Sequence, residues 1–195
     1  MANTLETIVN AYVRDCRERA RTEMRFFKMQ KSLAAAIRMA ALGLLPSSKR
    51  HPHQRRIPRA ILEEAELRLQ TATDKLTLVA DFAELHSLVK SEIGSMYGIG
   101  ELMVYDIAHR LGAYLDKEPT LIYLHAGTRV GARLLGFRGR TIRPNQLAPA
   151  FSGLTPAEIE DCLCIYADDL RKGALMDDGT NAARACRSAR RSRSC

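Results

Sequence analysis

The sequence contains no tryptophan, and aromatic residues make up only 6% of its 195 residues. Rows of stacked aromatic rings are a common basis for binding unpaired nucleic-acid strands, so this composition argues against that mode of binding. Long apolar runs are also missing. The most apolar stretch, residues 32–46, is too short to cross a bilayer and contains Arg38. No membrane partner is therefore expected.

The cysteines lack any metal-binding spacing. The chain has no C-x-x-C pair, and no cysteine stands at ligand spacing from a histidine. Cys162 and Cys164 are two positions apart on a predicted helix, so they point to different sides and do not chelate one ion. We therefore predict no metal and no cofactor. The first residues also lack the basic-then-apolar pattern of a signal peptide, and we expect a cytoplasmic protein.

Sustained strand alternation is absent, and the apolar residues follow helical spacing, so the predicted fold class is all-α. Residues 2–42 contain no glycine or proline, and Gly43 is the first helix terminator. One straight helix of that length is unusual in a globular domain, so we expect a break near residues 26–30. Its apolar stripe consists of Leu5, Ile8, Val9, Tyr12, Val13 and Cys16.

Capping residues mark several later elements. A second helical stretch begins at Pro58 and loosens at residues 73–74. Residues 118–127 are apolar and partly β-branched, which predicts a buried extended segment or a distorted turn. The expected cap and terminator residues are Thr128 and Gly136 for a short helix, then Thr155, Pro156, Glu158 and Gly173 for the last one. The predicted organisation is an N-terminal helical segment at 1–45, a basic linker at 46–57, a helical domain at 58–176, and a disordered arginine-rich tail at 177–195.

The formal net charge is +8, and it is unevenly placed. Lys49–Arg59 carries five basic side chains and no acid, and residues 181–195 carry five arginines and no acid. Such clusters favour a polyanionic partner, nucleic acid before an anionic membrane, although a solvated linker or tail has the same composition.

A Gly-Ile-Gly turn between two predicted helices is the most informative motif. The residues Ile93, Met96, Gly98, Ile99, Gly100, Val104 and Ile107 resemble the helix-hairpin-helix DNA-binding motif, over roughly residues 85–111. The resemblance implies that Gly98, Ile99 and Gly100 present backbone groups to phosphates at a helix N-terminus. Thr128, Arg129 and Arg133 are a second candidate set for phosphate contacts. Glu101, directly after the turn, departs from the motif because its charge opposes a phosphate. A plain interhelical turn is the alternative interpretation.

A weaker similarity links the order of elements to the helix-hairpin-helix DNA glycosylases of the endonuclease III type. In that family a catalytic lysine follows the hairpin, and a catalytic aspartate opens a later helix. The corresponding residues here are Leu102 and His125, so neither catalytic residue is matched. His125 is a candidate general base, with Asp106 or Tyr123 as its helper. The alternative is that His125 caps a loop and that Asp106 pairs with Arg110 four residues later.

The sequence therefore predicts a protein that binds duplex DNA non-specifically through a helix-hairpin-helix, with RNA as an alternative partner. A first rival is a divergent glycosylase-like or nuclease-like enzyme that uses His125. A second rival is a helical protein-interaction module, in which the N-terminal helix forms a homodimer and nucleic acid plays no part.

Overall fold

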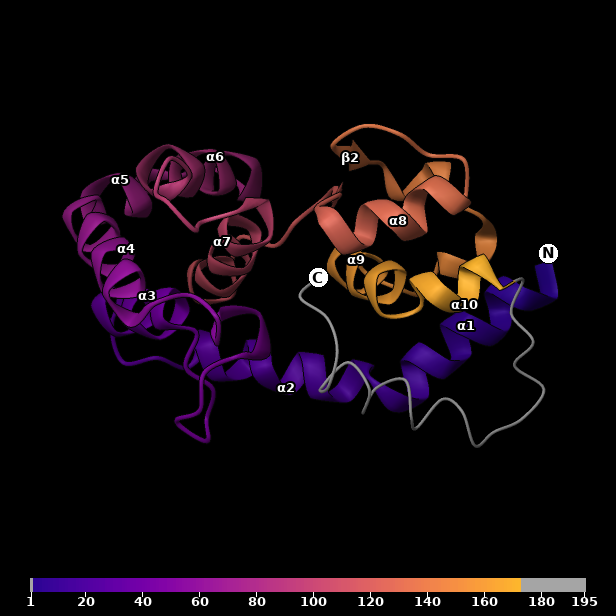
Figure 1. The fold of residues 1–195 in the computed structure, drawn as a ribbon, viewed down its shortest axis with the longest axis horizontal. Helices are drawn as coiled ribbons and strands as arrows, with labels where there is room; N and C mark the ends of the chain where they lie inside the picture. The colour runs from indigo at the N-terminus through magenta and orange to yellow at the C-terminus, as the bar shows by residue number, and fades with distance from the viewer. Residues whose placement is uncertain (1, 173–195) are drawn as a thin grey trace. The chain divides into compact units, whose positions relative to one another are not determined.

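The computed structural model describes residues 2–172, and these residues are mostly helical (Figure 1). The predicted all-α fold class is confirmed. The predicted disordered tail at 177–195 lies outside the described residues. Within them, the elements are α1 Ala2–Asp15, α2 Arg17–Lys28, α3 Leu33–Leu42, η1 Pro52–Gln54, α4 Arg59–Thr71, α5 Thr73–Leu78, α6 Phe82–Ile93, α7 Glu101–Leu115, β1 Ile122–Tyr123, α8 Ala126–Leu134, β2 Thr141–Ile142, η2 Pro144–Gln146, η3 Pro149–Phe151, α9 Pro156–Ile165 and α10 Ala167–Arg171.

The chain forms two compact units. Unit 1 combines Met1–Ala20 with Thr120–Cys195, of which residues 2–20 and 120–172 are described. Unit 2 is the intervening segment Arg21–Pro119. The boundaries of these units differ from the segment boundaries expected from the sequence. The reason is that α1 and the C-terminal helices share one hydrophobic core.

Unit 2 is a helical bundle built around α7. Helix α3 packs against α4 and α7, while α6 packs against α4 and α7. The apolar stripe of α6 predicted to be buried is buried at Phe82, Leu85, Val89 and Ile93, and α7 contributes Val104, Ile107 and Leu111. Helix α7 therefore lies at the centre of this unit, with the hairpin at its N-terminal end.

Unit 1 packs α8 against α9 and α10, with α1 lying against α9, α10 and η3. The predicted extended segment is present as β1, which pairs antiparallel with β2 through Ile122–Ile142 and Tyr123–Thr141. Helices α8 and α9 approach closely at Gly131, because a Cβ there would lie 2.4 Å from the Leu163 carbonyl oxygen. This contact requires glycine.

The N-terminal stripe that was a predicted dimer surface is buried inside unit 1. Ile8, Val9, Tyr12 and Cys16 belong to its hydrophobic core, and Leu5 packs against that core. Only Val13 of the stripe is exposed, at 39%. The apolar face of α1 is thus occupied by its own chain, so it offers no support for a homodimer.

The predicted break in the long N-terminal helix is confirmed. Helix α2 ends at Lys28 and α3 begins at Leu33, where the Ser32 side chain accepts a hydrogen bond from the Ala35 N–H. Gly43 ends α3 as predicted, with a φ of +61° that favours glycine. A second reason for glycine is space, since a Cβ at Gly43 would lie 1.9 Å from Gln54 Oε1.

Two expectations about local structure are wrong. Helix α8 begins at Ala126 with His125 as its N-cap residue, so Thr128 lies inside the first turn and is not the cap. The segment predicted as a linker without a core packs closely: Gln54 is fully buried, and its side-chain amide donates to the Met103 sulfur at 3.1 Å. The polar composition of residues 46–57 concealed that contact.

The last helix has the predicted start. Thr155 accepts a hydrogen bond from the Glu158 N–H, Glu158 accepts one from the Thr155 N–H, and Pro156 fills the first turn. The helix turns at Tyr166 into α10, short of the terminator expected at Gly173, which lies outside the described residues. Among residues 2–172, no helix combines the length and apolar character needed to cross a membrane.

Candidate functional site

The turn between α6 and α7 is a tight hairpin. Helix α6 ends at Ile93, and the chain turns through hydrogen bonds from Met96 N–H to Ile93 O (3.0 Å) and from Ile99 N–H to Met96 O (3.1 Å). Gly98 has a φ of +83°, a backbone conformation that residues other than glycine rarely adopt. Ile99 is 8% exposed, so it anchors the turn to the bundle while the glycines on either side stay at the surface.

The N-terminus of α7 is open. Gly100 is its N-cap residue, in extended backbone conformation, and no side chain caps the helix. The first backbone bond of this turn runs from Val104 N–H to Gly100 O, so the amides before it point out of the helix end. A Cβ at Gly100 would meet no atom within 4 Å. Backbone donors and the positive end of the helix dipole are therefore accessible here.

The basic segment Lys49–Arg59 ends beside this hairpin. A Cβ at Gly98 would lie 3.5 Å from Cδ1 of Ile61, in the first turns of α4. Arg59 begins that helix, and both Arg56 and Arg59 are exposed. Positive side chains and the open helix end thus share one part of unit 2, even though Glu101 is exposed there as well.

The second set of predicted phosphate contacts lies in unit 1. Thr128 is fully buried, so its hydroxyl does not face solvent, and we leave it out of the proposed interface. Arg129 is half-buried and donates to the Leu124 carbonyl oxygen at 2.8 Å. Arg133 is exposed on α8.

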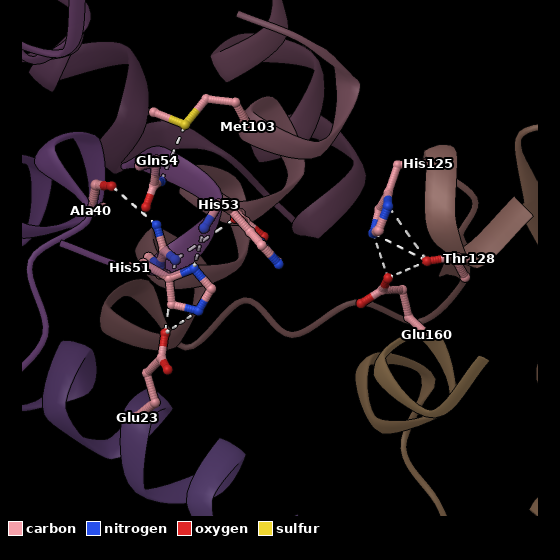
Figure 2. A network of polar contacts seen from close by, with 11 residues as sticks. Glu23, Ala40, His51, His53, Gln54, Met103, His125, Thr128 and Glu160 are labelled. Carbon is pink, nitrogen blue, oxygen red and sulfur yellow. Dashed lines mark hydrogen bonds and ion pairs between the residues drawn. The ribbon is translucent and has the colours of Figure 1, made fainter. Parts of the chain in front are cut away.

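His125 belongs to a buried polar cluster in unit 1, and Figure 2 shows its partners Thr128 and Glu160. The imidazole Nε2 is in hydrogen-bonding contact with the Glu160 carboxylate, which also accepts a hydrogen bond from the Thr128 hydroxyl. His125 is 3% exposed and Glu160 is 7% exposed. A general base must reach its substrate, so this geometry suits a role in joining α8 to α9 better than catalysis.

The residues proposed to assist His125 have other positions. Tyr123 lies half-buried in β1. Asp106 lies on α7 in unit 2, where its Oδ2 is 2.9 Å from His53 Nδ1 and 3.7 Å from Arg110 Nη2. The predicted pairing of Asp106 with Arg110 is thus present, but it is not a surface contact, because the Arg110 side chain is 3% exposed.

Arg110 and two histidines complete a polar cluster around Asp106. Arg110 Nη2 lies 3.8 Å from Glu23 Oε1, and the His51 Nε2 lies 3.9 Å from the same carboxylate (Figure 2). Burial raises the pKa of the Asp106 carboxyl, but Arg110 and the hydrogen bond from His53 outweigh this effect and hold its pKa well below the usual range. Asp106 is therefore ionised at neutral pH.

Sequence reasoning missed three of these partners. Glu160 is 35 residues from His125 and sits in a helix whose apolar stripe gave no reason to single it out. His51 and His53 lie within residues 46–57, whose composition predicts a basic linker. One signal was present, since the mid-helix Asp106 between apolar neighbours indicated a buried partner.

Comparison of the chain with known protein families, with curated proteins and with solved structures finds no match.

Proposed function

We propose that unit 2 binds duplex nucleic acid, DNA first, through a composite surface formed by the hairpin at residues 94–100 and the basic segment Lys49–Arg59. The observation that supports this most is the proximity of Ile61 to Gly98, where an added Cβ would lie 3.5 Å from Ile61 Cδ1, so the start of α4 lies beside the hairpin. The basic segment and the hairpin are 35 positions apart in the sequence, counted from Arg59 to Gly94, and the proposal is that both contact the same ligand.

The hairpin supplies hydrogen-bond donors to phosphate. Ile99 fixes the turn to the core, while Gly98 and Gly100 carry no side chain on its exposed side, next to the exposed Tyr97. A phosphate at the N-terminus of α7 receives backbone N–H groups and the positive end of the helix dipole. The exposed arginines of the basic segment add attraction at longer range.

Binding of this kind reads the phosphate backbone and not the base edges, so we expect no sequence preference. Glu101 limits its strength. A carboxylate and a phosphate about 6 Å apart in water repel by on the order of 0.7 kcal/mol, which lowers affinity about threefold. The Glu101→Gln variant should therefore bind duplex DNA more tightly than the wild type at low salt.

Gly100→Ala tests the proposal without disturbing the fold. The backbone conformation at Gly100 suits any residue, and the added methyl group meets no protein atom within 4 Å. The free energy of unfolding should change by less than about 1 kcal/mol, since the lost N-cap preference and the stiffer unfolded chain offset each other. The methyl group blocks close approach of a phosphate, and losing one charge-assisted hydrogen bond costs roughly 1.5–3 kcal/mol, tenfold or more in affinity.

Fluorescence anisotropy with a labelled duplex measures these affinities, and urea unfolding checks the fold. Gly153→Ala is the matched control, because Gly153 is exposed in unit 1 and its Cβ also meets nothing within 4 Å. The proposal predicts weaker binding for Gly100→Ala alone. Equal affinity of both variants and the wild type would show that the hairpin does not contact DNA.

A further inference from the structure

We propose that His51, His53 and Asp106 form a binding site for a divalent transition-metal ion, with Zn²⁺ as the first candidate. Ligand spacing in the sequence does not indicate this site, because the histidines and the aspartate are more than fifty positions apart. The proposed metal site is independent of nucleic-acid binding, and its test uses no DNA.

The geometry brings one donor atom from each residue into a small space. The three donor atoms all lie within 4.8 Å of one another, and His53 Nδ1 is 2.9 Å from Asp106 Oδ2. Donors on a tetrahedral zinc ion at roughly 2.0–2.2 Å lie about 3.3–3.6 Å apart. On metal binding the widest separation would therefore have to close by up to about 1–1.5 Å, and the 2.9 Å separation would have to widen by about 0.4–0.7 Å.

Access to solvent makes loading possible. The side chains of His51, His53 and Asp106 are 19%, 26% and 13% exposed, so an ion can reach the donors and keep a water ligand. The two imidazole rings stand edge to face with their centroids 4.5 Å apart. Three protein ligands and one open position are the usual composition of an accessible zinc site.

The donor set selects the kind of ion. Two imidazoles and one carboxylate suit Zn²⁺, Co²⁺, Ni²⁺ or Cu²⁺, whereas Mg²⁺ and Ca²⁺ prefer sites made of oxygen.

The charges around the donors bear on the site in both directions. Glu23 lies 3.9 Å from His51 Nε2 and supplies a second carboxylate, either as a ligand or as a partner for the imidazole. Arg110 lies 3.7 Å from Asp106 and 3.8 Å from Glu23 and opposes a cation. With neutral histidines, two carboxylates and one guanidinium leave one excess negative charge, which favours a cation in the cluster. A proton on His53 is the competing occupant.

A bound ion would link η1, which contains His53, to the middle of α7. Because η1 lies within the basic segment Lys49–Arg59, the ion would also hold that segment against α7. The residues concerned all lie in unit 2, so the cross-link is contained within one compact body. Metal loading should therefore stabilise unit 2 by mass action, since the unfolded chain lacks the assembled donors.

The test is a Zn²⁺ titration of the full-length protein, freed of metal by a chelator, in competition with a chromophoric indicator. We expect one site of high affinity in the wild type. His51→Ala/His53→Ala and Asp106→Asn should weaken it more than about 100-fold, because a lost ligand should exceed the 10- to 100-fold effect of changing a neighbour of a ligand. His86→Ala, a half-buried histidine on α6 of the same unit, is the matched control and should bind as the wild type does.

Two readouts on the wild type keep the test independent of variant folding. Co²⁺ bound by nitrogen and oxygen gives visible ligand-field bands without the thiolate charge-transfer band that cysteine ligands produce. Zn²⁺ should also shift the NMR signals of two histidine side chains and leave those of His86 and His109 in place. Absence of a stoichiometric site, a thiolate band, or unchanged signals from His51 and His53 would each overturn the proposal and leave a proton as the occupant.

Discussion

Replacing Arg110 by methionine should strongly destabilise unit 2. The guanidinium is 3% exposed, donates to the Ala40 carbonyl oxygen at 3.4 Å, and lies 5.4 Å from the centre of the Phe27 ring. It also lies within 4 Å of two carboxylates, those of Glu23 and Asp106. Methionine keeps an apolar stem in this position but removes the positive charge, which leaves both carboxylates without their shared cation.

The magnitude follows from the distances. Two opposite charges 3.7–3.8 Å apart attract with about 4.4 kcal/mol at an effective dielectric constant of roughly 20, so two pairs contribute about 9 kcal/mol before desolvation. Removing Arg110 from water opposes most of that gain. The net loss on removing one partner of a buried ion pair is about 3–5 kcal/mol, and we expect a value in this range because the Asp106 side chain is only 13% exposed.

Urea unfolding followed by circular dichroism measures the effect. Arg38→Met is the matched control: Arg38 is 54% exposed on α3 and pairs with Glu66 at 3.1 Å, so its loss should cost less than about 1 kcal/mol. Adding Asp106→Asn to Arg110→Met should recover part of the loss, since it removes an orphaned charge. A loss for Arg110→Met no larger than the loss for Arg38→Met would refute a stabilising role for the buried guanidinium.

Two further substitutions test the packing of unit 1. Gly131→Ala places a methyl group 2.4 Å from the Leu163 carbonyl oxygen, so α8 and α9 must separate. Thermal unfolding should show that the free energy of unfolding falls by about 1–3 kcal/mol, whereas the control Gly153→Ala should leave the melting temperature unchanged. Equal melting temperatures for the two variants would contradict the close approach of the two helices. Glu160→Gln removes the carboxylate that His125 and Thr128 share in a buried site. Urea unfolding should show that the free energy of unfolding falls by about 1–3 kcal/mol. An unchanged midpoint would mean that this cluster does not hold α8 to α9.

The sequence was sufficient to predict the helix ends whose capping signals lie within one helical turn. The capping box of Thr155 and Glu158 predicted the start of α9, and Gly43 predicted the end of α3, because both signals depend on hydrogen bonds within one helical turn. The break between α2 and α3 was also predicted, from helix length alone. These features need no knowledge of tertiary contacts.

The start of α8 was misplaced for a tertiary reason. Thr128 has the composition of an N-cap residue, but its hydroxyl is directed to Glu160 on another helix. Because its hydroxyl donates to this buried carboxylate, Thr128 is not positioned to cap its own helix. Local propensity was therefore overridden by a contact between residues 32 positions apart.

The candidate site was predicted in part. The sequence indicated the hairpin residues Gly98, Ile99 and Gly100, and their contribution to DNA binding stays a prediction. The polar cluster at Asp106 was not foreseen, because residues 46–57 look like a solvated linker in composition. Burial of Gln54 against Met103 draws that segment onto α7, and only the folded chain brings His51 and His53 to the aspartate.

The measurement that tests the central claim most directly is the salt dependence of duplex DNA binding. Lys49, Arg55, Arg56 and Arg59 are exposed in the basic segment, and up to four released counterions predict a slope of about −3 to −4 for log affinity against log salt. Affinity should then fall roughly 100-fold between about 50 and 200 mM salt. Arg55→Gln/Arg56→Gln should reduce the slope by about 2, while Arg38→Gln on α3 should not change it. A slope near zero, or one unaffected by the double substitution, would contradict the account.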